Sequence, residues 1–249
     1  MPRRKSGAAE TVVTSAMIEA ALRPLRWPRL RNVLGKAMHW SQKSQIEKRY
    51  DRFALEFIHG TPIVVMPGVF NPKLLRTGEY FASQINAAVL GDVVDVLDVG
   101  TGSGVCAIFA ARLAQRVVAV DINREAVRCA RINALLNNVE DRVDARSGDL
   151  FAPVGDAHFD VVLFNPPFLR GVPGTELDCA WRSTDVAERF AGTLRSHLKA
   201  TGFALVLLST FGGATVFIDE LRKQRFELSV LATRRFVNER LVIVCARAQ

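Results

Sequence analysis

The sequence has no long hydrophobic run. None of its apolar stretches approaches the roughly 18 residues that a membrane-spanning helix requires. The basic N-terminus, MPRRKSGAAE, continues into a polar stretch rather than the apolar core of a secretion signal. We therefore expect no membrane partner.

Cysteine and histidine are scarce and scattered. The four histidines show no ligand spacing, so no metal site is expected. No two cysteines form a CxxC pair, which argues against a disulfide framework or a zinc knuckle and favours the reducing cytoplasm. The cysteines are Cys106, Cys129, Cys179 and Cys245. With 49% hydrophobic and 23% charged residues, the chain has the composition of a globular domain.

Acidic residues are few in one region only. Residues 1–50 hold 11 Lys/Arg and three acidic residues, whereas residues 51–249 hold 22 of each sign. The whole excess of +8 therefore lies in the first segment, which we interpret as a basic helical extension. Together with Trp27 and Trp40, it suits contact with nucleic-acid phosphates. A solvated helical cap over a substrate crevice is an equally good interpretation.

The rest of the chain alternates between strand and helix patterns. Residues 51–92 predict a hairpin, in which Phe53, Leu55 and Phe57 alternate with period two, followed by an amphipathic helix. From Asp95 onward, apolar strands alternate with helices, which indicates a parallel sheet covered on both faces. Two final strand patterns joined by a short loop are expected to pair antiparallel.

A glycine-rich turn follows the first strand of this series. In VLDVGTGSGVCAIF, an apolar strand ends in Asp98, and Gly100, Gly102 and Gly104 form a tight turn into a helix. Such a turn lets backbone amides approach a ligand closely. The next strand, VVAVD, ends in Asp121, where a carboxylate can accept hydrogen bonds from the ribose hydroxyls of a nucleoside cofactor.

Three interpretations of this turn compete. It can be purely structural, or it can bind a dinucleotide, although Val105 occupies the third glycine position of that fingerprint. The third interpretation is S-adenosylmethionine, whose cationic amino-acid half carries no phosphate and favours a nearby carboxylate such as Asp98. We favour the third.

At these residues the sequence resembles the class I S-adenosylmethionine-dependent methyltransferases. VLDVGTGSG is similar to their first motif, VVAVDIN to their second, and SGDLF to the segment that lines the adenine. The resemblance implies a Rossmann-like α/β fold with a seven-stranded, mostly parallel sheet and an antiparallel last strand, with residues 93–249 as the methyltransferase domain. The cofactor-binding residues that it implies are Asp98, Gly100, Thr101, Gly102, Gly104, Asp121, Ile122, Asp149, Leu150 and Asn165.

The strand FDVVLF ends in the tetrapeptide NPPF, residues 165–168, because proline cannot donate to a sheet ladder. The tetrapeptide resembles the N-P-P-[YF] motif of amino methyltransferases. We expect the Asn165 side-chain oxygen and the Pro166 carbonyl to hold the N–H groups of a planar amide or amine. Phe168 would offer a face for the planar group to stack on.

The methyl acceptor is left open by the sequence. Enzymes with this tetrapeptide act on protein glutamine or on exocyclic amines of nucleic-acid bases, so a macromolecule is the favoured acceptor. The final Phe in place of Tyr, and the unfamiliar residues 1–50, argue against a simple assignment to the glutamine branch. A small-molecule N-methyltransferase with a helical lid and a non-catalytic binding module are the alternatives.

Overall fold

The computed structural model describes residues 15–22, 52–74, 76–172, 174, 182–210, 212–236 and 239–249. Of the basic N-terminal segment it therefore describes one helix, α1 (Ser15–Leu22). The predicted phosphate and stacking contacts of Trp27 and Trp40 lie outside the described residues. Within the described part, no helix is long and apolar enough to cross a membrane.

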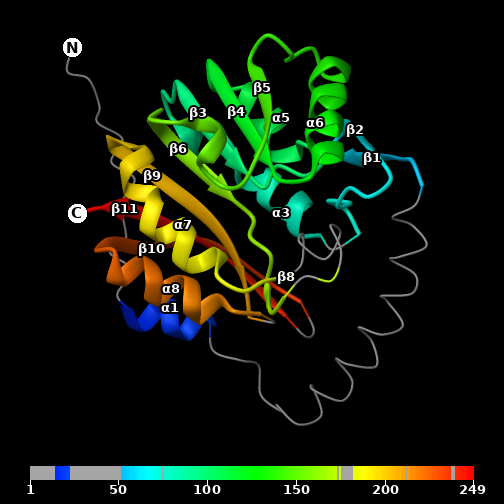
Figure 1. Cartoon of the computed structure of the whole chain (residues 1–249). Helices are drawn as coiled ribbons and strands as arrows, with labels where there is room; N and C mark the ends of the chain where they lie inside the picture. The colour runs from blue at the N-terminus through cyan, green and yellow to red at the C-terminus, as the bar shows by residue number, and fades with distance from the viewer. Residues whose placement is uncertain are drawn as a thin grey trace, which may run out of the picture.

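A seven-stranded sheet forms the centre of the molecule (Figure 1). Its strand order is β10-β11-β9-β6-β3-β4-β5, and β5, β4, β3, β6 and β9 run parallel. The last strand, β11, is antiparallel to both of its neighbours, as predicted. The strands are β3 (Asp95–Val99), β4 (Arg116–Asp121), β5 (Val143–Ser147), β6 (Phe159–Phe164), β9 (Leu198–Ser209), β10 (Phe226–Arg235) and β11 (Arg240–Ala248).

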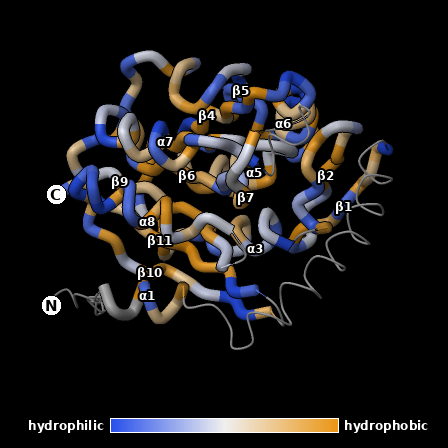
Figure 2. Tube along the Cα trace, turned by 60° about the horizontal axis from the view of Figure 1, so that its bottom comes forward, coloured by the Kyte–Doolittle hydropathy of each residue, from blue (hydrophilic) through white to orange (hydrophobic). Residues whose placement is uncertain are grey.

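Helices cover both faces of this sheet and give it two hydrophobic cores. Successive strand residues point to opposite faces, so Val96 and Val161 enter one core while Leu97 and Val162 enter the other. The first core packs against α3 (Thr77–Gln84), α5 (Val105–Ala111) and α6 (Arg124–Leu136). The second packs against α1, α7 (Val186–Leu194) and α8 (Ala214–Lys223). Figure 2 shows the central strands as the most hydrophobic part of the chain.

The predicted hairpin is present as β1 (Ala54–Ile58) and β2 (Thr61–Val65). It packs on the first core through Ile58, Ile63 and Val65. The alternating apolar residues of β1 face outward instead: Phe53, Leu55 and Phe57 are 70%, 57% and 55% exposed. Alternation thus identified the strand but not which of its faces is buried.

The amphipathic helix expected before the central sheet is interrupted. It is divided into α3 and α4 (Ala87–Leu90), because Asn86 caps α4 through its side chain. Further along the chain, α7 ends at Leu194 and is followed directly by the 3₁₀ turn Arg195–His197. The chain between β5 and α7 adds a 3₁₀ turn, Ala152–Val154, and two short paired strands, β7 (Leu169–Arg170) and β8 (Arg182–Ser183).

Candidate active site

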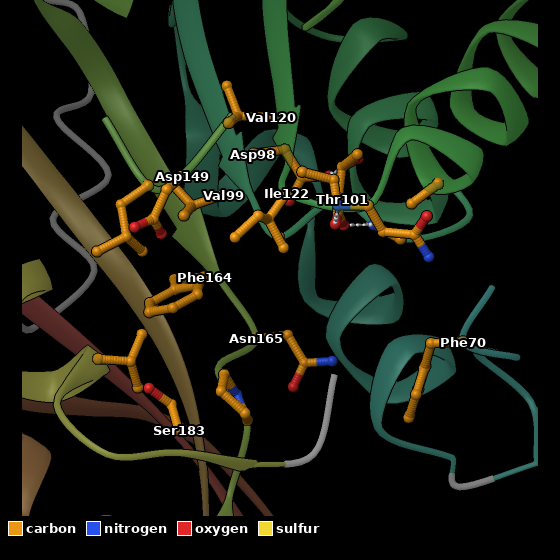
Figure 3. Close-up of a pocket in the computed structure, with 18 of the residues that line it drawn as sticks. Phe70, Asp98, Val99, Thr101, Val120, Ile122, Asp149, Phe164, Asn165 and Ser183 are labelled. Carbon is orange, nitrogen blue, oxygen red and sulfur yellow. Dashed lines mark hydrogen bonds between the residues drawn. The ribbon is translucent and has the colours of Figure 1, made fainter. Parts of the chain in front are cut away.

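A cavity of about 340 Å³ opens at the carboxyl ends of the parallel strands. Open α/β sheets bind ligands at this edge, and the volume lies in the range of small-molecule sites. Figure 3 shows its lining residues, with Asp98, Thr101 and Ile122 on one side and Asn165 and Ser183 on another. These residues lie in or directly after β3, β4, β6 and the short strand β8.

The turn after β3 brings backbone amides to the cavity. Gly100, Gly102 and Gly104 all have positive φ angles, of 65°, 56° and 83°. A Cβ atom on Gly104 would lie 2.9 Å from the Cα and Cβ atoms of Ala130 on α6, whereas one on Gly102 would meet nothing within 4 Å. Gly104 therefore allows α5 to pack closely on α6, and Gly102 leaves open space in front of the loop.

Asp98 is a buried carboxylate at the bottom of the glycine loop. Its Oδ2 atom accepts hydrogen bonds from the Thr101 hydroxyl at 2.6 Å and from the Ala107 N–H at 3.1 Å. Burial raises the pKa of Asp98 to about 7, although these two hydrogen bonds oppose the rise. A cation placed beside Asp98 would favour its ionised form, so the residue suits a positively charged ligand group.

Asp121, at the end of β4, holds the loop and faces the cavity. Its Oδ2 accepts the Gly102 N–H at 2.8 Å, and its Oδ1 accepts the Asn123 N–H at 2.9 Å. Burial raises the pKa of Asp121, and these backbone hydrogen bonds counteract that rise. The neighbouring Ile122 also lines the cavity and is 58% exposed. A carboxylate beside an uncovered apolar side chain suits a ribose joined to a flat base.

The turn after β5, which SGDLF predicts to lie beside the adenine, lines another side of the cavity. Leu150 and Asp149 both line the cavity, but the Asp149 carboxylate is paired with the Arg189 guanidinium of α7. Below them, Phe164 packs on Phe190 with ring centroids 4.5 Å apart. This side of the cavity is therefore largely hydrophobic, with the Asp149–Arg189 ion pair at its edge.

The NPPF tetrapeptide forms the part of the cavity beyond β6. The Asn165 Oδ1 atom is shielded from solvent and has no hydrogen-bond partner among the described residues. Phe168 also lines the cavity. Its carbonyl accepts the Gly213 N–H at 2.8 Å, which fixes the backbone at this position. An orphaned buried oxygen is costly, and here it lies where a ligand can satisfy it.

Most of the predicted site residues line the one cavity, and two do not. Gly104 packs against α6 instead, and Pro166 lines a smaller neighbouring cavity. Three further residues line the main cavity although no sequence motif singled them out: Phe70, Asn123 and Arg189. The Asn123 side chain donates to the Gly68 carbonyl at 3.0 Å and closes that wall. Its position two residues after Asp121 is a usable signal, whereas Arg189 reaches the site from the distant helix α7.

These residues fit S-adenosylmethionine. Asp98 suits the cationic amino group, Asp121 the ribose hydroxyls, and Ile122 and Leu150 the two faces of the adenine. Within the described residues there is no group of three or more His, Cys, Asp or Glu side chains that could hold a metal ion.

Three comparisons with known proteins place the chain among methyltransferases. It is 33% identical over 161 residues to a candidate protein glutamine methyltransferase of Methanocaldococcus jannaschii, covering 61% of this chain and 80% of that protein. It is 30% identical over 186 residues to the ribosomal protein uL3 glutamine methyltransferase of Bradyrhizobium diazoefficiens, covering 66% of this chain and 57% of that protein.

A solved structure shows the same fold. The T. thermophilus 16S rRNA methyltransferase in complex with AdoMet and guanosine superposes with a TM-score of 0.59 at 22% identity. The match covers 80% of this chain and 50% of that chain. Fold and cavity together define an S-adenosylmethionine-dependent methyltransferase of the Rossmann-like class. Residues 60–229 match the model of the methyltransferase small domain, and the chain belongs to that family.

Proposed function

We propose that this methyltransferase transfers its methyl group to a planar amide or exocyclic amino nitrogen. The observation that carries the proposal is the buried, unpaired Oδ1 atom of Asn165 in the cavity wall. A hydrogen-bond acceptor in this condition needs a donor from the substrate. An N–H group is such a donor, and a nitrogen held there faces the space that we assign to the cofactor.

Asn165 would act by orienting the nitrogen. The lone pair of an amide or aromatic amine is delocalised into its π system and is therefore a poor nucleophile. An acceptor that grips its N–H groups can turn the lone pair toward the methyl carbon. Two prolines make this arrangement rigid, so orientation costs little at the moment of reaction.

The remaining chemistry needs no nucleophilic side chain. When bound, S-adenosylmethionine supplies an electrophilic methyl carbon and leaves as S-adenosylhomocysteine once the new N–C bond has formed. Asn165 has no basic group, so the proton lost by the methylated nitrogen passes to water. The protein contributes position and an acceptor-lined, largely apolar site.

The acceptor is proposed to be a macromolecule, either protein glutamine or an RNA base. Two of the relatives above are glutamine methyltransferases by name. A third is the ribosomal RNA small subunit methyltransferase C of Alcanivorax borkumensis, which is 31% identical over 140 residues, 56% of this chain and 40% of that protein. The relatives' names thus include both a protein glutamine and a ribosomal RNA acceptor. They support a planar nitrogen as the methylated atom but do not distinguish the two acceptors.

The test is to identify the methylated atom. Purified protein is incubated with isotope-labelled S-adenosylmethionine and with protein, RNA and metabolite fractions from cells that lack the gene. Mass spectrometry then locates the label. Label on a glutamine amide or an exocyclic base amine supports the proposal. Label on carbon, on oxygen or on an aliphatic amine would overturn it.

A further inference from the structure

Four arginines gather at the free end of the β10–β11 hairpin, next to the cavity. We call them the hairpin-end arginines: Arg76, Arg234, Arg235 and Arg240. Arg76 directly precedes Thr77 and Gly78, at the start of α3, and Gly78 lines the cavity. Figure 2 shows the end of the β10–β11 hairpin as hydrophilic and close to α3.

The strand registers place this end at the edge of the sheet where the cavity opens. Phe164, the last residue of β6, is aligned with Val206, Val206 with Val244, and Val244 with Val230. From Val230 to Arg235 the strand continues for roughly 15 Å at about 3.3 Å per residue. The hairpin therefore extends beyond the strand that carries Asn165, at the same edge of the sheet.

The like charges at this end are not neutralised by carboxylates. Arg235 and Arg240 are directly opposite each other in the hairpin register, a pairing of like charges that costs stability. Arg76 and Arg234 both lie over the ring of Phe236, at 5.5 and 5.3 Å from its centroid. Among the described residues, none of these arginines has an ion pair.

The acidic residues nearby do not compensate. Glu239, in the hairpin turn, accepts a hydrogen bond from the Ser209 hydroxyl and is largely buried, which raises its pKa. Glu79 of α3 forms no ion pair in the described part of the chain. Residues 51–249 are neutral as a whole. The cluster is therefore a local concentration of positive charge and not part of a general excess.

We propose that the hairpin-end arginines bind the phosphate backbone of an RNA substrate while its target base enters the cavity. This inference rests on the proposed function and narrows its acceptor to RNA. Arg76, Arg234 and Arg235 are exposed, and such guanidinium groups match phosphate oxygens in a bidentate manner. Arg240 is half-buried and its Nη1 donates to the Ala20 and Ala21 carbonyls of α1, so it adds positive charge rather than a free donor. Guanidinium groups stacked on Phe236 also present the arginine–aromatic surface on which unpaired bases stack. A protein substrate would need carboxylates to complement these positive charges, and it has no bases to stack on Phe236 and its arginines.

The experiment measures binding of a fluorescein-labelled, 20-nucleotide single-stranded RNA of mixed sequence. Affinity is determined by fluorescence anisotropy between 50 and 300 mM NaCl, with S-adenosylhomocysteine present. We expect Arg234→Glu/Arg235→Glu to weaken binding at least tenfold at low salt. The slope of log affinity against log salt should fall by about 1 to 2, as expected when one or two phosphate contacts are lost.

A matched control separates a local contact from a change in total charge. Arg112 and Lys223 are exposed at the opposite edge of the sheet, so Arg112→Glu/Lys223→Glu changes the net charge equally. This variant should keep the wild-type salt slope. If both double variants weaken RNA binding equally, the local contact is refuted.

Arg235→Glu alone excludes a structural explanation, because Arg235 stacks on no ring in the described structure. It also places an acid opposite Arg240, so the melting temperature should stay unchanged or rise while RNA binding weakens. If RNA binding is unchanged and methylation of a protein fraction is lost, the proposal of an RNA substrate is refuted and an acidic protein is the substrate instead. RNA binding is measured without turnover, so it can be confirmed even if Asn165 proves dispensable for transfer.

Discussion

The side chain of Asn133 holds both backbone groups of Val64. Its Oδ1 accepts the Val64 N–H at 2.8 Å, and its Nδ2 donates to the Val64 carbonyl at 2.7 Å. The same Nδ2 donates to the Ser103 carbonyl at 2.8 Å. One fully buried amide thus joins the β1–β2 hairpin, helix α6 and the glycine loop. The hairpin is part of the support of the cofactor site.

Asn133→Ala should therefore lower the free energy of unfolding by about 3 kcal/mol, because several buried backbone groups lose a partner at about 1 kcal/mol or more each. Urea unfolding measures this change. Asn137→Ala, at the C-cap of α6, is the control: its amide donates to the Pro62 and Asn133 carbonyls and accepts a long, exposed hydrogen bond from Arg112 at 3.4 Å. A similar loss in both variants would contradict a special role for Asn133.

Asn165→Ala should reduce methyl transfer by about 100-fold or more, the usual effect of removing one preorganised polar group from a reaction site. The cofactor dissociation constant should change only a few-fold. A tritiated-methyl assay and calorimetry measure the two quantities. Asn165→Asp keeps an acceptor oxygen in the same volume and should retain more activity than the alanine variant. Full turnover by Asn165→Ala would remove this residue from the mechanism.

Cofactor affinity should rise with pH through about 7. Burial raises the pKa of Asp98 to about 7 in the free protein, and the cationic cofactor is held best by the ionised carboxylate. Asp98→Asn should bind S-adenosylmethionine weakly and without this pH dependence. Calorimetry between pH 5.5 and 8.5 measures both effects.

A fragment separates the two carboxylates of the site. 5′-Methylthioadenosine contains the nucleoside but lacks the cationic amino-acid half of the cofactor. Asp98→Asn should leave the affinity for 5′-methylthioadenosine nearly unchanged. Asp121→Asn should lower the affinity for the fragment and for the whole cofactor by a similar factor. An equal loss of fragment affinity in both variants would reverse our assignment of Asp98 to the amino group.

The same carboxylate makes the free protein less stable as the pH rises. The pKa of Asp98 is near 4 when unfolded and about 7 when folded. Between these values the folded state holds the extra proton, so stability falls with rising pH. Three pH units correspond to roughly 4 kcal/mol as an upper limit. Asp98→Asn should flatten the dependence of urea midpoints on pH between 4 and 7, and an unchanged slope would argue against the raised pKa.

Gly104→Ala should destabilise the fold more than Gly102→Ala. Both glycines have positive φ angles, which cost a non-glycine residue about 1 kcal/mol. Only at Gly104 would the added methyl group also press on Ala130, an overpacking cost of about 1 to 3 kcal/mol. Gly102→Ala should instead act mainly on cofactor affinity, since its methyl group would point into open space in the site. Thermal unfolding and calorimetry distinguish the two effects.

The central sheet could be predicted from sequence because each parallel strand is an apolar run bounded by turn residues. The carboxyl edge of such a sheet collects the residues near the strand ends, so the sequence predicts that Asp98, Asp121 and Asn165 lie close together, and all three line the same cavity. Short-range patterns carry this information, since each residue lies within one position of the end of its strand.

Contacts between distant segments could not be predicted in this way. Nothing in the pattern of α6 marks Asn133 as the partner of Val64, 69 positions earlier. Arg189 and Asp149 are 40 positions apart and meet only because α7 packs beside the turn after β5, where Phe190 stacks on Phe151. The outward direction of Phe53, Leu55 and Phe57 likewise depends on which face of the hairpin meets α6. These features depend on tertiary packing, and the local hydrophobic periodicity of the sequence contains no information about it.

The hydrogen bond from Gly102 to Asp121 has a consequence for the rate of cofactor exchange. Asp121 already holds the glycine loop in one conformation through this hydrogen bond. The loop therefore loses little conformational entropy when the cofactor binds. Association should then be a simple one-step encounter, with little change in amide hydrogen exchange at residues 100–104. Spent cofactor can leave by the same open route without a loop rearrangement, so renewal of the methyl donor need not limit successive turnovers.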